Sequence, residues 1–354
     1  MALTKKMTLL RKKPLSLLAS LITFSAFVAA EENDPATNKV ELREVIVSHT
    51  DERDVLQLYR VKEDGTSRRQ LTRSERGCRM PSCSPDGKKL VYVEKVNHSL
   101  AIWISDLDGK NARSLVDQGM NLVPSWLPDS KHIVWMKTQP GQDPSQKSQI
   151  HIMNTETGGS RRLFSDPEQL KCSNSMPVVS PRGDLIAFIS NRNGKMRVWV
   201  SKLDGSKARK ISLPETEVHP TIKAPIEQKV PAWSPDGRWI AHWEGVEMIH
   251  MSKFTGIPNP KRDQQIAETF HVWVVDRDGR NRRKVGRGDD PTWSPDGFVT
   301  RAFPEPKRGG PMVMVESTTG EKELPIVPER RNWGRFTWIP KVAGKPDGRP
   351  LPGK

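Results

Sequence analysis

The feature that most constrains this chain is a tight-turn sequence, Trp-Ser-Pro-Asp-Gly at 233–237, that recurs along its length. Complete or degenerate copies occupy 84–87, 126–130, 180–183, 293–297 and, truncated, 338–340. Proline presets the backbone of the first corner position, Asp can bond the turn backbone, and Gly supplies the positive φ that closes a hairpin. The repeat therefore predicts a chain of equivalent units, each with a tight turn at the same place, and a structural role for the turn Asp residues.

A second turn signal, Asp-x-Asp-Gly or a variant of it, alternates with the first and has its glycine at 65, 109, 158, 205, 279 and 320. Short segments of alternating and β-branched residues separate the turns, which is typical of all-β proteins. Successive prolines of the first signal lie 43, 53, 54, 60 and 45 residues apart. A four-stranded propeller blade takes roughly 40 to 45 residues, and loop insertions account for the excess. We predict an all-β, six-bladed β-propeller of four-stranded antiparallel blades over residues 43–340.

The order of these segments resembles the repeat of the TolB propeller family: the Trp-Ser-Pro-Asp-Gly turn, an apolar strand, an Ile-Trp-Ile strand and Asp-x-Asp-Gly. The resemblance implies that the inner strand of each blade ends at the Trp-Ser-Pro turn. The chain would then begin with three outer strands (43–72) and end on a lone inner strand (335–338), and pairing of the two ends would close the ring. TolB itself carries an α/β domain before its propeller, whereas we expect a stand-alone propeller here, because 31–42 is too short for such a domain.

The first 30 residues have the layout of a secretory signal peptide, with a basic start, an apolar run over 15–30 and small residues before two glutamates. The apolar run falls just short of the roughly 17 to 25 residues that span a bilayer, so no stable membrane insertion is expected. We predict a signal peptide at 1–30, a linker at 31–42, a disordered tail at 341–354 and a periplasmic or secreted location.

The formal charge of +15 includes five cations of the predicted signal peptide, so the mature chain would carry +10. A basic surface favours anionic partners, although it also serves solubility alone. Export separates the protein from nucleic acid, which we therefore exclude as a partner. We expect a monomer that binds a protein or an anionic polymer such as a polyuronide.

The alternating direction of strands in a blade places both short turn types on one face of the propeller, here called the turn face. The remaining connections lie on the opposite face, here called the long-connection face. Nearly all long insertions belong to the long-connection face: 137–147, 213–230, 244–270 and 301–310. Loops on a rigid scaffold are frequent binding sites, so we expect ligand binding on this face, above all at 244–270.

Four of the eight histidines cluster in sequence around the fifth blade: His219, His242, His250 and His271. Neutral imidazole is a common metal ligand and a proton carrier near neutral pH. All four are candidate metal ligands, and His242 and His250 are candidate catalytic residues. They show no recognised metal-ligand spacing, so packing or surface roles stay open.

Register singles out His242, which stands where other blades carry the aromatic residues Tyr92, Trp135 and Phe188. With one gap, Arg301 stands there in the sixth blade. Two adjacent blades would then place ionisable groups near the long-connection face, either as an anion pocket or as caps of the core. The candidate ligand-binding set is His242, Glu244, Glu247, Arg262 and Arg301.

The segment 241–245, Ala-His-Trp-Glu-Gly, is similar to the His-Glu-Gly segment of oligogalacturonate lyases. Those propellers use a divalent metal on polyuronide fragments. The resemblance implies an alternative function, a metal-dependent lyase or hydrolase of anionic oligosaccharides. Our leading hypothesis is a non-catalytic, exported binding module that needs no cofactor.

Two further sets complete the prediction. Polar residues shortly before each turn would line the central channel entrance: Arg79, Asn121, Asn174, Lys229, Asp290 and Arg331. Cys78 and Cys83 are a candidate disulfide pair in an oxidising compartment, which would leave Cys172 free and buried.

Signal-peptide cleavage after Ala30 is testable on the purified native protein. We expect mass spectrometry of the intact protein to show Glu31 as the first residue, because small residues precede this position. An intact N-terminus would contradict the prediction.

Overall fold

The computed structural model describes residues 42–138, 147–212, 214, 216–246, 260–302, 312–316, 320–324 and 336–341. For 260, 262, 263, 302, 312–316 and 320–324 it describes the backbone alone. The chain divides into two compact units, Met1–Lys39 and Val40–Lys354, and every described residue belongs to the second unit. The predicted signal peptide, most of the predicted linker and nearly all of the predicted tail lie outside the described residues.

The described strands form antiparallel meanders, in which each strand pairs with the next one along the chain. The first sheet has the order β24-β1-β2-β3 and contains β1 (Glu44–Thr50), β2 (Leu56–Lys62), β3 (Arg69–Gln70) and β24 (Thr337–Trp338). An eight-stranded sheet follows, in which one parallel residue pair, Leu100 with Met120, joins two meanders. The first contains β4 (Cys78–Cys83), β5 (Lys89–Val96), β6 (Ser99–Asp106) and β7 (Arg113–Val116). The second contains β8 (Met120–Trp126), β9 (His132–Thr138), β10 (Gln149–Asn154) and β11 (Gly158–Arg162).

Three four-stranded sheets of the same kind follow. One contains β12 (Asn174–Val179), β13 (Leu185–Ser190), β14 (Arg197–Lys202) and β15 (Arg209–Lys210). The next contains β16 (Ile226–Trp233), β17 (Trp239–Val246), β18 (His271–Asp276) and β19 (Arg283–Arg287). The last contains β20 (Asp289–Trp293), β21 (Val299–Ala302), β22 (Met312–Glu316) and β23 (Gly320–Leu324).

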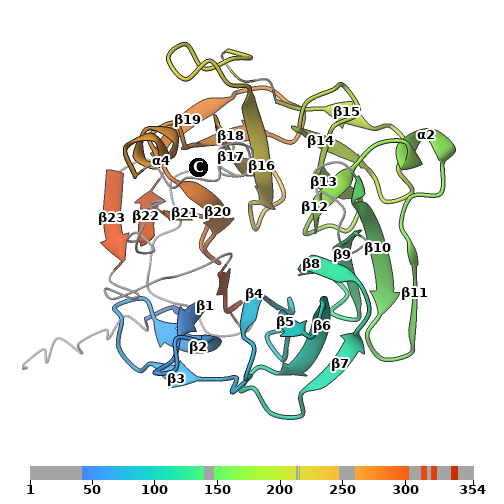
Figure 1. The fold of residues 1–354 in the computed structure, drawn as a ribbon, viewed down its shortest axis with the longest axis vertical. Helices are drawn as coiled ribbons and strands as arrows, with labels where there is room; N and C mark the ends of the chain where they lie inside the picture. Colours follow the sequence, from blue (N-terminus) through green and yellow to red (C-terminus); the bar gives the residue numbers. More distant parts are fainter. Residues whose placement is uncertain are drawn as a thin grey trace, which may run out of the picture. The chain divides into compact units, whose positions relative to one another are not determined.

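These sheets follow one another around a common centre (Figure 1). Successive first strands contact one another, from β24 to β4, β8, β12, β16 and β20. Hydrophobic side chains fill the space between neighbouring sheets, as where Phe164 packs against Phe188 with ring centroids 5.3 Å apart. The fold is therefore all-β, with four-stranded antiparallel meanders arranged as in a β-propeller.

The recurring turn forms as its residue types predict. The hydroxyl of Ser84 donates to Oδ1 of Asp86 (2.6 Å) and accepts from the backbone N–H of Lys89 (2.9 Å). Gly87 closes the turn at a φ of +69°. The turn at 234–237 repeats the serine-to-aspartate bond at 2.5 Å. The turn Asp residues are thus structural, as predicted.

A second regularity was not predicted. Each first strand from β4 to β20 contains a bulge where the pairing register shifts. The bulge residue precedes a proline and has a φ between 42° and 55°: Met80, Val123, Met176, Val230 and Asp290. Residues with a Cβ rarely adopt this conformation. The proline four residues before the turn proline therefore marks a recurring bend in the strands nearest the centre.

The two ends of the described unit meet at Arg43. Strand β24 pairs antiparallel with β1, through Trp338 opposite Val45. Arg43, only 6% exposed, donates to Glu63 (2.7 Å) and to Asp296 (2.5 Å). These three residues, here called the Arg43 cluster, join the start of β1 to the turn at 294–297. Burial alone would raise the pKa of Asp296, but the Ser294 hydroxyl and Arg43 lower it, so the carboxylate stays charged.

Within the described ranges, two helices with defined bounds interrupt the β structure. Helix α2 (Pro167–Leu170) begins at the cap residue Asp166, and helix α4 (Pro260–Ala267) lies in the 244–270 insertion. The Pro/Lys/Arg-rich composition of this insertion gave no sign of α4. Neither helix is long and apolar enough to cross a membrane, and this holds for every described helix.

The predicted Cys78–Cys83 disulfide is wrong. The two cysteines occupy opposite ends of β4, and both are free and buried. The ends of a six-residue strand are roughly 16 Å apart at about 3.3 Å per residue, whereas a disulfide needs Cα atoms within roughly 7 Å. Burial raises the pKa of both thiols to about 12. Cys172 is free as predicted but only partly buried.

The Arg43 cluster makes a stability prediction. We expect Arg43→Ala to lower the free energy of unfolding by about 3–5 kcal/mol in urea titrations, because it leaves two buried carboxylates without their cation. Arg53→Ala is the matched control, since Arg53 makes an ion pair with Asp51 while its side chain is 56% exposed. If Arg43→Ala were as stable as Arg53→Ala, the Arg43 cluster would contribute nothing to the free energy of unfolding.

Candidate functional site

The structure places His242 and Arg301 where register predicted them. His242 faces Trp273 across the strand pair, as Tyr92 faces Trp103 and Phe188 faces Trp199. Arg301 takes the same position on β21. His242 is 0% and Arg301 1% exposed. Both residues therefore replace packing aromatics inside the core and do not cap it at the solvent.

His242 belongs to a buried polar network. Its Nε2 lies 3.1 Å from the Ser212 hydroxyl and 3.2 Å from Oε1 of Glu244. Gln228 donates to that same Oε1 (2.7 Å) and to the Ser212 hydroxyl (3.1 Å). Arg282 donates to Oε2 of Glu244 (2.7 Å) and stacks on the Trp273 ring. We call Ser212, Gln228, His242, Glu244 and Arg282 the His242 network.

Charge is balanced within this network. Glu244 is 5% exposed, and burial alone would raise its pKa. The hydrogen bonds of His242 and Arg282, together with the positive charge of Arg282, outweigh burial, and the pKa of Glu244 is lowered. The carboxylate is therefore ionised at neutral pH, with donors on both oxygens, and is not poised to accept a proton.

Sequence analysis found only His242 and Glu244 of this network. Ser212 follows β15 and lies near no motif, whereas Arg282 precedes β19 and follows the second turn signal, whose glycine is Gly279. Gln228 immediately precedes Lys229, which was predicted to line the channel entrance. The signal that could have revealed it is the amide side chain three residues before the bulge proline, shared with Asn121 and Asn174.

The 244–270 insertion is anchored at its C-terminal end. Phe270 stacks on Trp243 with ring centroids 4.7 Å apart, and Ile266 is 0% exposed. The Thr269 hydroxyl accepts from the backbone N–H of Val246 (2.9 Å). Of the predicted residues, Glu247 and His250 lie outside the described residues, and Arg262 is placed only as backbone of α4. Ile266, Thr269 and Phe270 thus fix the C-terminal end of the insertion to the core.

The candidate metal ligands that the structure describes do not converge. Nδ1 of His219 accepts the backbone N–H of Ile222 (3.2 Å). His271 is half-buried, its Nδ1 lies 2.9 Å from Thr269 O, and burial together with nearby cations lowers its pKa. Within the described ranges, no group of three or more His, Cys, Asp or Glu side chains could hold a metal. Arg282 already donates to the Glu244 carboxylate. The described candidate ligands, His219, His242 and His271, therefore do not fit a divalent metal.

The predicted channel entrance is corrected at two positions. Asn121 and Asn174 are 0% exposed and line no opening. The Asn121 amide donates to Leu100 O (2.8 Å), and the Asn174 amide donates to Gln169 O (2.7 Å). Both fasten the first strand of their meander to the segment before it.

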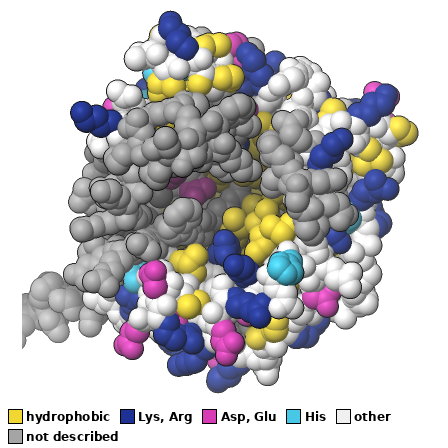
Figure 2. All heavy atoms as spheres, in the orientation of Figure 1, with side chains coloured by type: hydrophobic (Ala, Val, Ile, Leu, Met, Phe, Trp, Pro, Cys, Tyr) yellow, Lys and Arg dark blue, Asp and Glu magenta, His cyan; other side chains and the backbone are white. Residues whose placement is uncertain are grey.

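The other entrance residues occupy different registers. Arg79 and Lys229 lie two residues before the bulge proline, and Asp290 lies one before it. Lys229 is 8% exposed, whereas Arg79 and Asp290 are partly exposed. Arg331 lies outside the described residues. Hydrophobic and basic side chains do gather beside β8 and β12 near the common centre (Figure 2).

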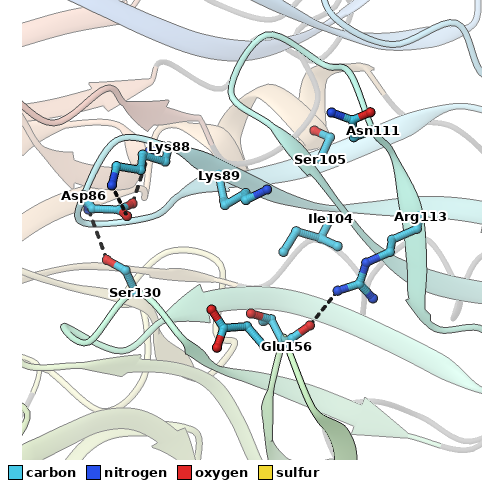
Figure 3. A pocket seen from close by; sticks show the side chains of 10 residues that line it. Asp86, Lys88, Lys89, Ile104, Ser105, Asn111, Arg113, Ser130 and Glu156 are labelled. Carbon is cyan, nitrogen blue, oxygen red and sulfur yellow. Dashed lines mark hydrogen bonds and ion pairs between the residues drawn. The ribbon is translucent and has the colours of Figure 1, made fainter.

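A cavity that sequence analysis did not predict lies on the turn face. It is lined by two meanders, β4 to β7 and β8 to β11 (Figure 3). Its volume is ≈ 380 Å³, within the range of roughly 300–1,000 Å³ typical of ligand sites. Asp86 and Ser130 in its lining belong to the recurring turns, to which the sequence assigned only a structural role.

A family model for the TolB beta propeller domain matches residues 41–254 of this chain. The chain belongs to this family. Its fold is that of TolB from Acinetobacter baumannii, with a TM-score of 0.64 and 18% identity over 84% of this chain and 67% of that chain. At this identity the likeness shows the fold alone.

Two relatives are similar to this chain over part of its length. An uncharacterized protein of Agrobacterium fabrum is 26% identical over 234 residues, 62% of this chain and 69% of that protein. A TolB homologue of Chlorobium luteolum is 30% identical over 153 residues, 43% of this chain. This chain spans 33% of the length of the Chlorobium homologue.

The network of this TolB-family propeller makes a pH prediction. Because the folded pKa of Glu244 is lowered, its contribution to stability is present above the unfolded pKa and is lost as pH falls. We expect Glu244→Gln to cost about 2–3 kcal/mol at neutral pH in urea titrations. Below about pH 4 the difference from wild type should shrink.

Glu268→Gln is the matched control for that measurement. Glu268 follows α4 and is exposed, so its stability should follow wild type across the pH range. A pH-independent difference between Glu244→Gln and wild type would contradict the ionised state of Glu244.

Proposed function

We propose that this chain is an exported, six-bladed β-propeller that acts as a non-catalytic binding module for a protein partner. Six four-stranded meanders and the pairing of β24 with β1 support a closed ring. The signal-peptide layout of 1–30 supports export to the periplasm or beyond the cell. In this proposal 31–42 is a linker and 341–354 a disordered tail.

The observation that carries the binding role is the anchored insertion on the long-connection face. Ile266 and Phe270 hold helix α4 against β17. Lys261, Gln264 and Gln265 of the same helix are exposed. A polar helix fixed by apolar residues to a rigid sheet presents side chains in a defined place without ordering cost at binding. The basic charge of the chain favours a partner whose contact surface is acidic.

The enzymatic alternative has less support. The two residues of the lyase-like segment, His242 and Glu244, bind each other, the buried partners Ser212 and Gln228, and the partly exposed Arg282. A lyase or hydrolase of polyuronides would instead carry a divalent metal. A stoichiometric metal in the purified protein, together with turnover of polygalacturonate, would overturn the proposal.

Site-specific photo-crosslinking tests the proposed surface. We expect a photoreactive residue at Gln264, in cells that make the protein, to give a discrete crosslinked protein band. Lys110 is the matched control, because it is equally exposed but belongs to the turn face. The additional change Lys261→Glu should weaken the band by several-fold through charge repulsion with an acidic partner.

Absence of a band at Gln264, or an equal band at Lys110, would contradict binding through the long-connection face. Circular dichroism and urea unfolding of each variant verify that the fold is retained.

A further inference from the structure

The cavity on the turn face exists because the residue at one junction between meanders is too small to fill it. In three meanders, the residue after the third strand donates its backbone N–H to the carbonyl of the residue that follows the preceding turn. Leu107 donates to Lys88 O (3.0 Å), Thr155 to Lys131 O (2.8 Å) and Arg277 to Arg238 O (2.9 Å). Glu63 does the same with Arg43, and Leu203 has the matching strand register.

At four of these positions the side chain fills the junction with the preceding sheet. Glu63 takes part in the Arg43 cluster, and Leu107 packs with Leu71. Leu203 packs with Phe164, and Arg277 makes an ion pair with Asp184 (3.0 Å).

Thr155 occupies the fifth position and leaves its junction open. Its hydroxyl donates to the carbonyl of Lys131 in its own meander (3.0 Å), so the polar group of the side chain is not directed across the junction. The inner wall of the resulting cavity consists of Ile104, Ser105 and Thr155, all at most 6% exposed. The cavity is therefore a built recess and not a surface dimple.

Donors outnumber acceptors at the rim. Arg113 uses one N–H on Thr155 O (2.6 Å), and no described residue accepts from its Nε or Nη1. Lys88 lies 4.0 Å from Asp86, whose Oδ1 already accepts from the Ser84 hydroxyl. Figure 3 shows Arg113 and Glu156 facing the recess from opposite meanders. An ionised oxygen of a ligand could accept hydrogen bonds from the remaining N–H groups of Arg113.

We propose that this recess binds a carboxylate-bearing segment of a protein, with one Asp or Glu side chain against Arg113. The Glu156 carboxylate, which has no partner in the described part of the chain, would accept an N–H of the same segment. A polyuronide suits the recess less well, because its repeated carboxylates would be repelled by Glu156 and Asp86. This site lies on the opposite face from the proposed long-connection surface and stands independently of it.

The probe for this proposal is acetyl-Gly-Glu-Gly amide, titrated into the full chain with labelled isoleucine methyl groups. We expect a saturable shift of the Ile104 methyl signal. Acetyl-Gly-Gln-Gly amide should bind at least tenfold more weakly, because it lacks the charge that Arg113 pairs with.

Two variants locate the binding. Thr155→Leu introduces the side chain that closes two equivalent junctions, and it should abolish the shift while leaving the melting temperature at or above that of wild type. Arg113→Gln should weaken binding at least tenfold. Arg209→Gln is the matched control, because Arg209 makes the equivalent bond to Arg277 O (2.6 Å) at a closed junction.

No saturable shift with the Glu peptide, equal binding of the Gln peptide, or unchanged binding by Thr155→Leu would each overturn the proposal. So would a loss in Arg209→Gln as large as that in Arg113→Gln. Tighter binding of trigalacturonate than of the Glu peptide would assign the recess to a saccharide and not to a protein segment.

Discussion

The junction between neighbouring sheets is the constraint on which this structure depends. Each meander presents two faces, and its neighbours must cover both for the sheet to be stable. On the turn face one backbone position closes four of the five junctions described above, with a different side chain each time. Charge closes it at Glu63 and Arg277, and apolar packing closes it at Leu107 and Leu203. Since the scaffold tolerates each solution, a small residue such as Thr155 opens a recess without changing the fold.

The same logic explains the buried ionisable side chains in the fifth and sixth meanders. The position of Tyr92, Trp135 and Phe188 must be filled in every meander, because it faces the core. A histidine in that place loses its contact with water and requires polar partners. Ser212 and Glu244 supply them, Gln228 donates to both of these residues, and Arg282 balances the carboxylate. His242 thus brings a polar network into the core, which a residue-by-residue search for ligands would mistake for an open site.

Sequence patterns predicted the fold well because they report local backbone chemistry. The Ser-Pro-Asp-Gly turn forms through bonds within five residues, as at Ser84 and Lys89. Register counted from the turn proline placed His242 and Arg301 correctly, because strands between fixed turns leave no freedom to slip. The prediction that Asn121 and Asn174 line a channel used only their place shortly before a turn and was wrong, since it ignored the bulge at Val123 and Met176. The Cys78–Cys83 pairing was also wrong, because short separation in sequence is long separation along a strand.

The sequence by itself determined the repeating unit, the strand order and the division into a turn face and a long-connection face, because each of these depends on turns and alternation within a few residues. Only the tertiary structure decided which of the singled-out residues are enclosed. His242 and Glu244 are buried by partners that lie up to 38 residues away in the chain, and the recess beside Thr155 exists between two separate meanders. Burial and cavities arise where distant segments meet, and no local pattern records how well they fill the space between them.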